Sequence, residues 1–265
     1  MKHLHFEYYM KLEFDQPVHD HRFTVKCIPQ SDERQQIVHL DVDIYPNGFL
    51  TENQDSHGNR CIFGFAQKSH RYFSIKVSGR AKTACDNREA PGDFYRDAIY
   101  RYETWYTRPG PCLQEFARSF TFSQGATAIE KTSTWMERLY RTFCYEQGAT
   151  TVDTTAEQAM ELGKGVCQDY AHILISLCRM EQIPARYVVG MLVGEGASHA
   201  WVEVFQDGYW YGFDPTNGIR VGEQHVKISS GRDYNDCRIN QGLFVGTNGQ
   251  KQLISVKVEE MENDD

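Results

Sequence analysis

The sequence predicts an α+β protein in two parts. An N-terminal antiparallel β domain, sandwich-like in architecture, is expected over residues 1–90, and over residues 91–265 a core in which a helix packs on an antiparallel sheet. Apolar side chains recur at every second position in the first part. The apolar period then changes to that of helices, and two strand-like runs flank a hairpin signal late in the chain.

The composition is that of a folded protein without a nucleic-acid partner. Hydrophobic residues make up 40% of the chain and charged residues 24%, which is ordinary globular usage. Asp and Glu outnumber Lys and Arg 36 to 28, giving a net charge of -8. A phosphate-binding surface needs clustered positive charge, so this balance argues against nucleic-acid binding.

The sequence shows neither a secretory signal nor a membrane span. Charged residues interrupt residues 1–7 before an apolar signal region forms, and no run approaches the roughly eighteen apolar residues that a spanning helix needs. We therefore expect a soluble, cytoplasmic protein that does not bind membranes. The acidic residues 259–265 are expected to form a solvated terminus.

Eight cysteines are scattered along the chain, and none stands in a Cys-x-x-Cys pair. This spacing argues against a metal site built on sulfur. In a reducing compartment such cysteines act mostly as small buried apolar residues. The count alone leaves open whether one of them is reactive.

Short alternating runs predict the strands of the first part. The clearest run is formed by apolar residues at alternate positions between polar ones: Val38, Leu40, Val42 and Ile44. Residues 46–48, Pro-Asn-Gly, end this run with turn-forming residues. The pattern repeats at Phe73, Ile75 and Val77, and residues 55–59 supply a loop between the two runs.

A domain boundary is expected at residues 89–93, where Pro and Gly interrupt the alternation. Beyond it, Thr134-Trp135-Met136-Glu137 has the form of a capping box and predicts a helix start. A second box at Thr154-Thr155-Ala156-Glu157 predicts a shorter helix that Gly163 ends.

Cys167 lies where a glycine-punctuated loop, residues 163–166, runs into an apolar helical pattern. Proline disfavours helical geometry in the residue before it, so Ile183-Pro184 is expected to end this helix, which we predict to be buried. Unpaired amides and the positive helix end stabilise a thiolate at a helix start, which makes Cys167 a candidate nucleophile. Its backbone amide is a candidate oxyanion donor, and the glycines would let backbone approach an acyl group. A cysteine at a helix start is also compatible with simple packing.

A nucleophilic thiolate needs a base, and the nearest histidine in the sequence does not fit. Five residues at about 100° each place His172 roughly 140° around the helix from Cys167. The better candidate is His199, in the strand-like residues 198–205.

The candidate orienting carboxylate is Asp214. The residues between the two strand-like runs, Asp207-Gly208, are a strong two-residue hairpin signal. With that loop Trp201 opposes Asp214, and His199 becomes a diagonal neighbour of Asp214 on the same face. A three-residue loop would turn Asp214 to the other face. The alternative is that His199 and Asp214 form a buried polar pair without a catalytic role.

At these residues the sequence closely resembles the transglutaminase-like superfamily, whose papain-like core presents a helix-start Cys followed by His and Asp on neighbouring strands. The resemblance is carried by four segments in order: residues 165–172, 183–187, 199–204 and 212–217. Residues 231–236 resemble the bacterial branch, and the β-rich first part is similar to the N-terminal domain that accompanies bacterial cores.

The resemblance implies that Cys167 attacks an amide or ester carbonyl, that His199 transfers the proton, and that Asp214 orients His199. It implies a peptide or protein substrate and no cofactor or metal. The side-chain oxyanion donor is left open, with Trp135 and Tyr187 as suggestions and Gln168 expected to point away. The natural substrate and the oligomeric state are not fixed by the sequence.

Three functions remain at this stage. We favour a cysteine peptidase or amidase, in which water resolves the acyl-enzyme. The alternative is a transglutaminase-type acyltransferase, in which an amine does so with the same three residues. A non-catalytic binding scaffold is a further alternative, and the intact Cys-His-Asp set argues against it.

Overall fold

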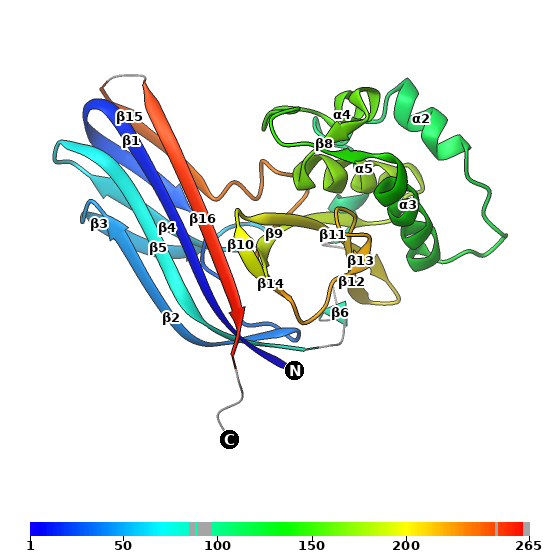
Figure 1. Cartoon of the computed structure of the whole chain (residues 1–265), viewed down its shortest axis with the longest axis horizontal. Helices are drawn as coiled ribbons and strands as arrows, with labels where there is room; N and C mark the ends of the chain where they lie inside the picture. Colours follow the sequence, from blue (N-terminus) through cyan, green and yellow to red (C-terminus); the bar gives the residue numbers. More distant parts are fainter. Residues whose placement is uncertain (85–87, 90–96, 247–248, 262–265) are drawn as a thin grey trace.

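The protein is described here from a computed structural model covering residues 1–84, 88–89, 97–246 and 249–261. Two parts lie side by side: a curled antiparallel sheet, and a smaller sheet with helices packed on it (Figure 1). The predicted α+β class is confirmed. The expected boundary at residues 89–93 falls mostly on residues outside the described ranges.

The curled sheet takes strands from three regions of the chain. Its members are β1 (Lys2–Val25), β2 (Gln35–Tyr45), β3 (Phe49–Gln54), β4 (Arg60–Ala66), β5 (His70–Thr83), β10 (Gly194–Gly196), β15 (Asn240–Val245) and β16 (Gln250–Glu260). The first half of β1 pairs with β5 and β16. Its second half pairs with β4 and β15. One long strand therefore belongs to both layers of a sandwich, and the register shift between Glu13 and Val18 marks the change of layer.

The last strands correct the expected division of the chain. We expected residues 91–265 to form the second domain, but β15 and β16 belong to the first sheet. β16 pairs with β1 from Leu4 opposite Glu260 to Phe14 opposite Gln250. An edge strand needs a partner for its backbone groups, and for β1 that partner comes from the other end of the described chain.

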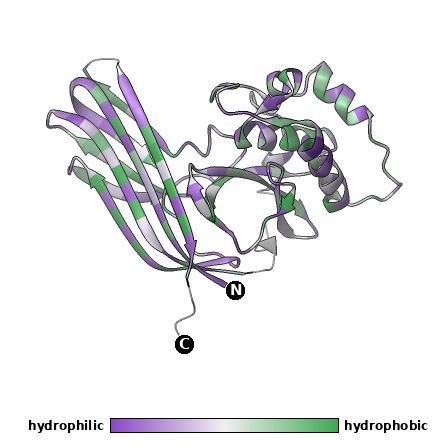
Figure 2. Cartoon of the chain, in the orientation of Figure 1, coloured by the Kyte–Doolittle hydropathy of each residue, from purple (hydrophilic) through white to green (hydrophobic). Residues whose placement is uncertain are grey.

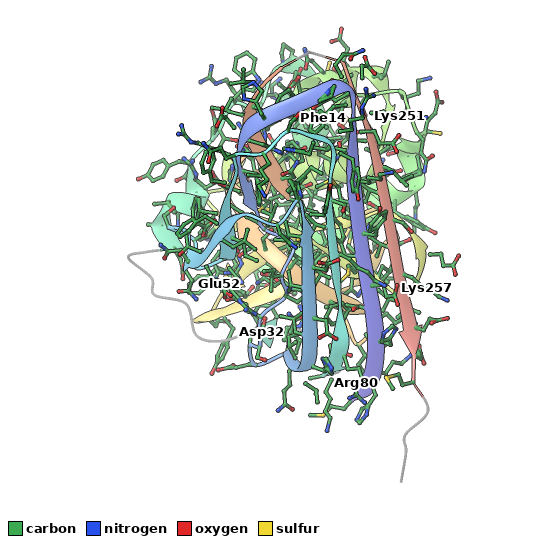
Figure 3. All side chains as sticks on the ribbon, turned by 90° about the vertical axis from the view of Figure 1, so that its left-hand side faces the viewer. Phe14, Asp32, Glu52, Arg80, Lys251 and Lys257 are labelled. Carbon is green, nitrogen blue, oxygen red and sulfur yellow. The ribbon has the colours of Figure 1, made fainter. Side chains whose placement is uncertain are left out.

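Alternation along the strands explains the sandwich core. β1 buries every second residue between Leu4 and Phe14, and Figure 2 shows the corresponding alternation of apolar and polar residues along β1, β5 and β16. Figure 3 shows charged side chains on the outer face, among them Lys251 and Lys257. The inner side chains exclude water and supply the apolar burial that holds the layers together.

Strand β2 departs from its predicted burial. The strand exists, but Val38 is 53% exposed and Val42 is 37% exposed, whereas Ile44 is buried. β2 lies at an edge, with a register irregularity between Ile37 and His39. A bulged edge strand does not keep one face against the core, so alternation alone overestimated its burial.

The second part is a six-stranded sheet covered by helices (Figure 1). Its strands are β6 (Arg88–Glu89), β9 (Ala185–Leu192), β11 (His199–Gln206), β12 (Tyr209–Asp214), β13 (Ile219–Arg220) and β14 (His225–Gly231), and a separate parallel pair is formed by β7 (Cys144–Tyr145) and β8 (Lys164–Gly165). The helical elements are η1 (Ala98–Arg101), α2 (Pro111–Arg118), α3 (Ala128–Thr142), α4 (Ala156–Leu162) and α5 (Cys167–Met180). Among the described residues, no helix is long and apolar enough to cross a membrane.

Two helix starts differ from the sequence expectation. Helix α3 begins after Thr127, which forms a capping box with Glu130, so Thr134 lies inside the helix. Helix α4 begins after Thr155, one residue later than expected, and Thr155 forms a capping box with Gln158. The Thr134 hydroxyl instead donates to the carbonyl of Glu130, the alternative use of a hydroxyl within a helix.

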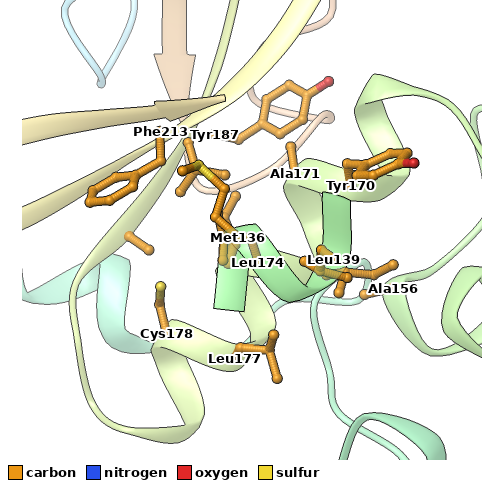
Figure 4. Packing of buried hydrophobic residues seen from close by; sticks show 14 of the residues in the cluster. Met136, Leu139, Ala156, Tyr170, Ala171, Leu174, Leu177, Cys178, Tyr187 and Phe213 are labelled. Atoms are coloured by element: carbon orange, nitrogen blue, oxygen red, sulfur yellow. The ribbon is translucent and has the colours of Figure 1, made fainter. Parts of the chain in front are cut away.

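Helix α5 is the centre of the second core. Every residue from Gln168 to Arg179 is buried. Figure 4 shows part of the cluster around it, in which Met136 and Leu139 of α3 pack with Leu174 of α5. The predictions of a buried helix beginning at Cys167, and ending before Ile183-Pro184, are confirmed. Apolar packing and the hydrogen bonds of buried polar residues such as Arg179 fix the helix, and with it the position of its first residue.

The two parts are joined by specific hydrogen bonds as well as apolar contacts. The Asn59 side chain donates to the Ser230 carbonyl at 2.8 Å and accepts from the Ser230 amide at 2.8 Å. Lys26 Nζ donates to the Asp236 carbonyl at 2.8 Å. Met191 and Val226 of the second sheet belong to the apolar cluster of the sandwich. The loop at residues 55–59 and the segment at residues 231–236 are thus parts of one joint.

The position of β16 predicts unequal effects of two truncations on that strand. Val258 is 1% exposed and Leu253 is 57% exposed. We expect Val258→Ala to lower the free energy of unfolding by about 2 kcal/mol, and Leu253→Ala to change it by less than about 0.5 kcal/mol. Denaturant titration measures both, and equal effects would contradict the placement of β16 in the sandwich core.

Candidate active site

The start of helix α5 is held by a buried carboxylate. Asp169 Oδ2 accepts from the Val166 amide at 2.7 Å and from Thr150 Oγ1 at 2.6 Å. A Cβ atom at Gly165 would lie 2.4 Å from the same oxygen, so this position has room only for glycine. Glycine at this position therefore leaves space for Asp169, and close approach of the backbone to an acyl group stays a prediction. Cys167 is thereby fixed at the first position of the helix.

The hairpin of β11 and β12 has the two-residue turn that the sequence predicted. Asp207 and Gly208 have φ values of 51° and 86°, the left-handed conformation that such tight hairpin turns require. The strand register, continued one residue past its last paired residues, places Trp201 opposite Asp214. His199 lies two residues from Trp201 and therefore on the same face as Asp214.

His199 and Asp214 are hydrogen bonded. The distance from His199 Nε2 to Asp214 Oδ2 is 2.8 Å, and Asp214 is fully buried. The carboxylate also accepts from the Thr216 and Asn217 amides at 3.1 and 3.2 Å and from the Asn217 side chain at 2.8 Å. Burial alone would raise the pKa of Asp214, but the hydrogen bonds from His199 and His225 outweigh it and hold the pKa well below the ordinary value.

His199 faces Cys167 on its other side. Burial lowers the pKa of His199, but hydrogen bonds to Asp214 and to Cys167 outweigh burial and raise it to about 10. Since Nε2 is bound to Asp214, Nδ1 is the ring nitrogen left for the sulfur. The structure thus brings Cys167, His199 and Asp214 together, in the order nucleophile, base and carboxylate that the sequence predicted.

A second histidine on Asp214 was not found from the sequence. His225 Nε2 lies 3.2 Å from Asp214 Oδ2, and its Nδ1 accepts from the Gly222 amide at 3.3 Å. This acceptor role places the proton on Nε2, which donates to the carboxylate. His225 lies on β14, where no local spacing relates it to Asp214, so only the folded sheet shows the contact.

His199, Asp214 and His225 also form a group of potential metal ligands, with their ligand atoms within 4.8 Å of one another. A metal would need an unprotonated nitrogen from each ring. The Gly222 amide holds the His225 proton on the nitrogen that faces Asp214. The contacts therefore favour a hydrogen-bonded network over a metal centre.

The other residues considered from the sequence take separate places. His172 is buried against Tyr106, its Nε2 accepts from the Tyr234 amide at 3.2 Å, and burial lowers its pKa to about 3. The ring centroids of Trp135 and Phe122 lie 5.4 Å apart in the helical core, and Trp135 is not among the residues that line the cavity of Cys167.

Two of the remaining suggestions do border the site. Tyr187 and Gln168 both line the cavity that contains Cys167. Gln168 was expected to point away, but it lines the cavity while its amide donates to the Val152 carbonyl at 3.0 Å. Burial, and then the neighbouring Cys167, raise the pKa of Tyr187 well above its ordinary value. Tyr187 therefore keeps its proton beside the sulfur.

Cys167 and His199 open into a cavity of about 500 Å³. Helix α5 and strand β11 supply one wall. The opposite wall comes from the sandwich, including Tyr8 and Leu12 of β1 and Gln252 of β16. This volume is within the range of sites for small molecules and short chain segments.

This fold and site define a structural class, the papain-like proteins with a Cys-His-Asp site. Residues 114–215 match the transglutaminase-like superfamily, and residues 4–82 match the bacterial transglutaminase-like N-terminal region. The chain therefore belongs to the transglutaminase-like superfamily and carries the N-terminal region of its bacterial branch.

Similar proteins include one solved structure with the same fold and uncharacterized mycobacterial proteins that match part of the chain. A solved structure from Cytophaga hutchinsonii, described as a proposed cysteine protease, has a TM-score of 0.80 and 20% identity over 99% of this chain and 92% of that chain; at that identity it shows the fold. An uncharacterized protein of Mycobacterium leprae is 36% identical over 38% of this chain and 39% of its own length. One of Mycobacterium tuberculosis is 35% identical over 36% of this chain and 35% of its own length.

The hydrogen bond from His225 predicts a graded set of variants. His225→Phe removes the donor to Asp214 and keeps a ring against Trp201, and we expect turnover to fall by roughly tenfold. His225→Gln keeps an N–H donor and should restore part of that loss. Steady-state kinetics, measured together with the unfolding free energy of each variant, separates a positioning role from a structural one. If His225 had a purely structural role, turnover would follow the stability of the variants and would not depend on whether they carry a hydrogen-bond donor.

The raised pKa of His199 predicts a charged imidazole at neutral pH. Since its folded pKa of about 10 exceeds the unfolded value near 6.5, its contribution to stability is complete below pH 6.5 and is lost as pH rises toward 10. In Asp214→Asn the pKa of His199 should fall, because the carboxylate that offsets the lowering effect of burial is gone. Histidine titration by NMR checks this, and an unchanged His199 curve in Asp214→Asn would contradict it.

Proposed function

We propose that the protein is a cysteine peptidase or amidase that forms an acyl-enzyme on Cys167. The observation that carries this proposal is the hydrogen bond between His199 and Asp214 on the face that meets Cys167, inside a cavity of about 500 Å³. A buried polar pair alone would not require a sulfur beside it or an adjoining cavity. The superfamily placement supports the same class of chemistry.

The residues divide the work as follows. The sulfur of Cys167 attacks the carbonyl carbon, and the C–O double-bond electrons move to oxygen. His199 gives its proton to the leaving amine as the C–N bond breaks, and a thioester remains on Cys167. His199 then takes a proton from water as the water attacks the thioester, the C–S bond breaks, and the carboxylic acid is released with the Cys167 thiolate and the protonated His199 restored. Asp214 holds the imidazole in orientation throughout.

Charge on the tetrahedral oxygen requires hydrogen-bond donors. The first amides of a helix have no partner within the helix, so the Cys167 amide is a suitable donor. Tyr187 lines the same cavity and retains its proton, which makes its hydroxyl the second donor that we propose. Trp135 is not among the residues that line this cavity, so we do not propose it for this role.

Labelling with iodoacetamide and hydrolysis of a peptide ester test the nucleophile. Cys167→Ala should abolish both the labelled site and turnover. His199→Ala should slow hydrolysis roughly 100- to 10,000-fold, the usual range for a general acid-base. Cys144→Ala is the matched control, since Cys144 is an exposed free cysteine outside the cavity. Trapping an acyl adduct on Cys167 by mass spectrometry would identify the intermediate directly.

The products distinguish hydrolysis from acyl transfer. With a glutamine-containing peptide and a primary amine, we expect cleavage or deamidation and little amine incorporation. Predominant amine incorporation would replace the hydrolase by the transferase on the same three residues. Wild-type turnover that persists in Cys167→Ala would contradict the proposed function altogether.

A further inference from the structure

The sandwich supplies one wall of the cavity beside Cys167, and the side chains of this wall differ in kind from Cys167, His199 and Asp214. It includes Tyr8 and His21 from the two halves of β1, Phe244 of β15, and Gln252 and Ile254 of β16. Segment β10, which leads to His199, pairs with β16 and fixes the wall against the catalytic strand. A group held by this wall therefore has a defined position relative to the nucleophile.

Apart from the imidazolium of His199, the described side chains that line the wall and the rest of the cavity carry no formal charge. Among the described residues that line the cavity, none is Asp, Glu, Lys or Arg, although such residues form 24% of the chain. The polar groups of the cavity include five carboxamides, together with hydroxyl groups and two histidines; the carboxamides are those of Gln147, Gln168, Asn240, Gln250 and Gln252. A charged substrate group buried here would lack a counter-ion and pay its desolvation cost uncompensated, whereas an uncharged polar group would find hydrogen-bond partners.

Tyr8 presents a hydroxyl without a protein partner. The residue is fully buried, and its hydroxyl has no hydrogen bond among the described residues. Burial raises its pKa, so the hydroxyl keeps its proton and is a donor. Buried hydroxyls are normally paired, and an unpaired one at a cavity points to a ligand group that pairs with it.

His21 presents an acceptor, and its hydrogen bonds determine why. His70 Nδ1 lies 2.9 Å from the Lys68 carbonyl and must donate to it. In the neutral pair, His70 Nε2 then accepts from His21 Nδ1 at 3.2 Å, which leaves a lone pair on His21 Nε2. Burial, together with His70, lowers the pKa of His21 to about 4, so the ring is neutral.

The local packing keeps this acceptor in place and open. Aromatic rings surround His21 at centroid distances of 5.0 to 6.0 Å: Phe14, Phe23, Phe73 and Phe244. A Cβ atom at Gly242 would lie 2.8 Å from His21 Nε2. Glycine at this position therefore leaves space in front of the acceptor.

We propose that this wall is a substrate subsite for uncharged groups that accept or donate hydrogen bonds, such as a carboxamide or a hydroxyl. Tyr8 donates to an oxygen of the bound chain, and His21 Nε2 accepts from an N–H or O–H of that chain. The proposal rests on the proposed acyl-enzyme chemistry of Cys167 and adds the selection of the substrate. Chains that end in a carboxylate or an ammonium are excluded by the absence of a counter-ion.

Aryl esters that share the same acyl chain but differ in the chemical group at its far end test this subsite. The ends are a primary carboxamide, a hydroxyl, a methyl ketone, a carboxylate, an ammonium and a methyl group, in chains of increasing length, with aryl acetate as the reference. Release of the aryl alcohol in the first turnover measures acylation of Cys167. At one chain length we expect the carboxamide and hydroxyl to acylate at least tenfold faster than the charged ends. The methyl ketone, which accepts but cannot donate, should lie between carboxamide and methyl.

Two tyrosine variants make the test specific. Tyr8→Phe should bring the carboxamide rate close to that of the methyl-ended chain when both rates are divided by the acetate rate of the same variant. Because the Tyr8 hydroxyl is unpaired, its removal should preserve the unfolding temperature. Tyr9→Phe is the matched control, since Tyr9 is the next residue of β1 and faces the opposite side of the strand.

The outcomes separate the two proposals. Rapid acylation by acetate with equal rates for all chain ends, or faster acylation by a charged end, would overturn the subsite and leave the proposed function standing. No acylation by any ester, acetate included, would overturn the catalytic proposal and with it the subsite. A secondary amide end in the same chain distinguishes a peptide backbone amide from a side-chain carboxamide as the natural group.

Discussion

The hairpin turn at Asp207-Gly208 is the constraint on which the site depends. Its left-handed residues fix a two-residue loop, and that loop fixes which face of β12 carries Asp214. On this face the carboxylate meets His199, while backbone amides and His225 satisfy its remaining acceptor positions. A carboxylate so fully paired stays ionised although it is buried, and it can hold an imidazolium beside a sulfur.

Two different environments share the cavity. At one end a pair of ionisable groups is stabilised by Asp214, and at the other a wall without formal charge is built from aromatic rings and carboxamides. This separation matters because a second fixed negative charge near Cys167 would compete with Asp214 for the His199 imidazolium. The joint through Asn59 and Ser230 holds the two ends in one arrangement.

Local patterns carried the predictions that proved accurate, and long-range contacts caused the failures. Cys167 and Asp214 were placed by a loop-to-helix junction and by a turn, both of which act over a few residues. His225 reaches Asp214 only through sheet pairing of β14, and the pairing of β16 with β1 joins segments from the two ends of the described chain. At the start of α3, two hydroxyl residues seven positions apart offered similar caps, and packing selected Thr127.

The pairing of β1 with both β5 and β16 sets an order for assembly during translation. The ribosome releases β1 and β5 early, but the opposite edge of β1 waits until helix α5 and the β11–β12 hairpin have been made and β16 follows them. A nascent chain thus contains Cys167, His199 and Asp214 before β16 closes the sandwich beside them, and non-local pairing of this kind is slow. An unpaired strand edge is exposed during that interval, and such an edge can pair with a strand of another chain.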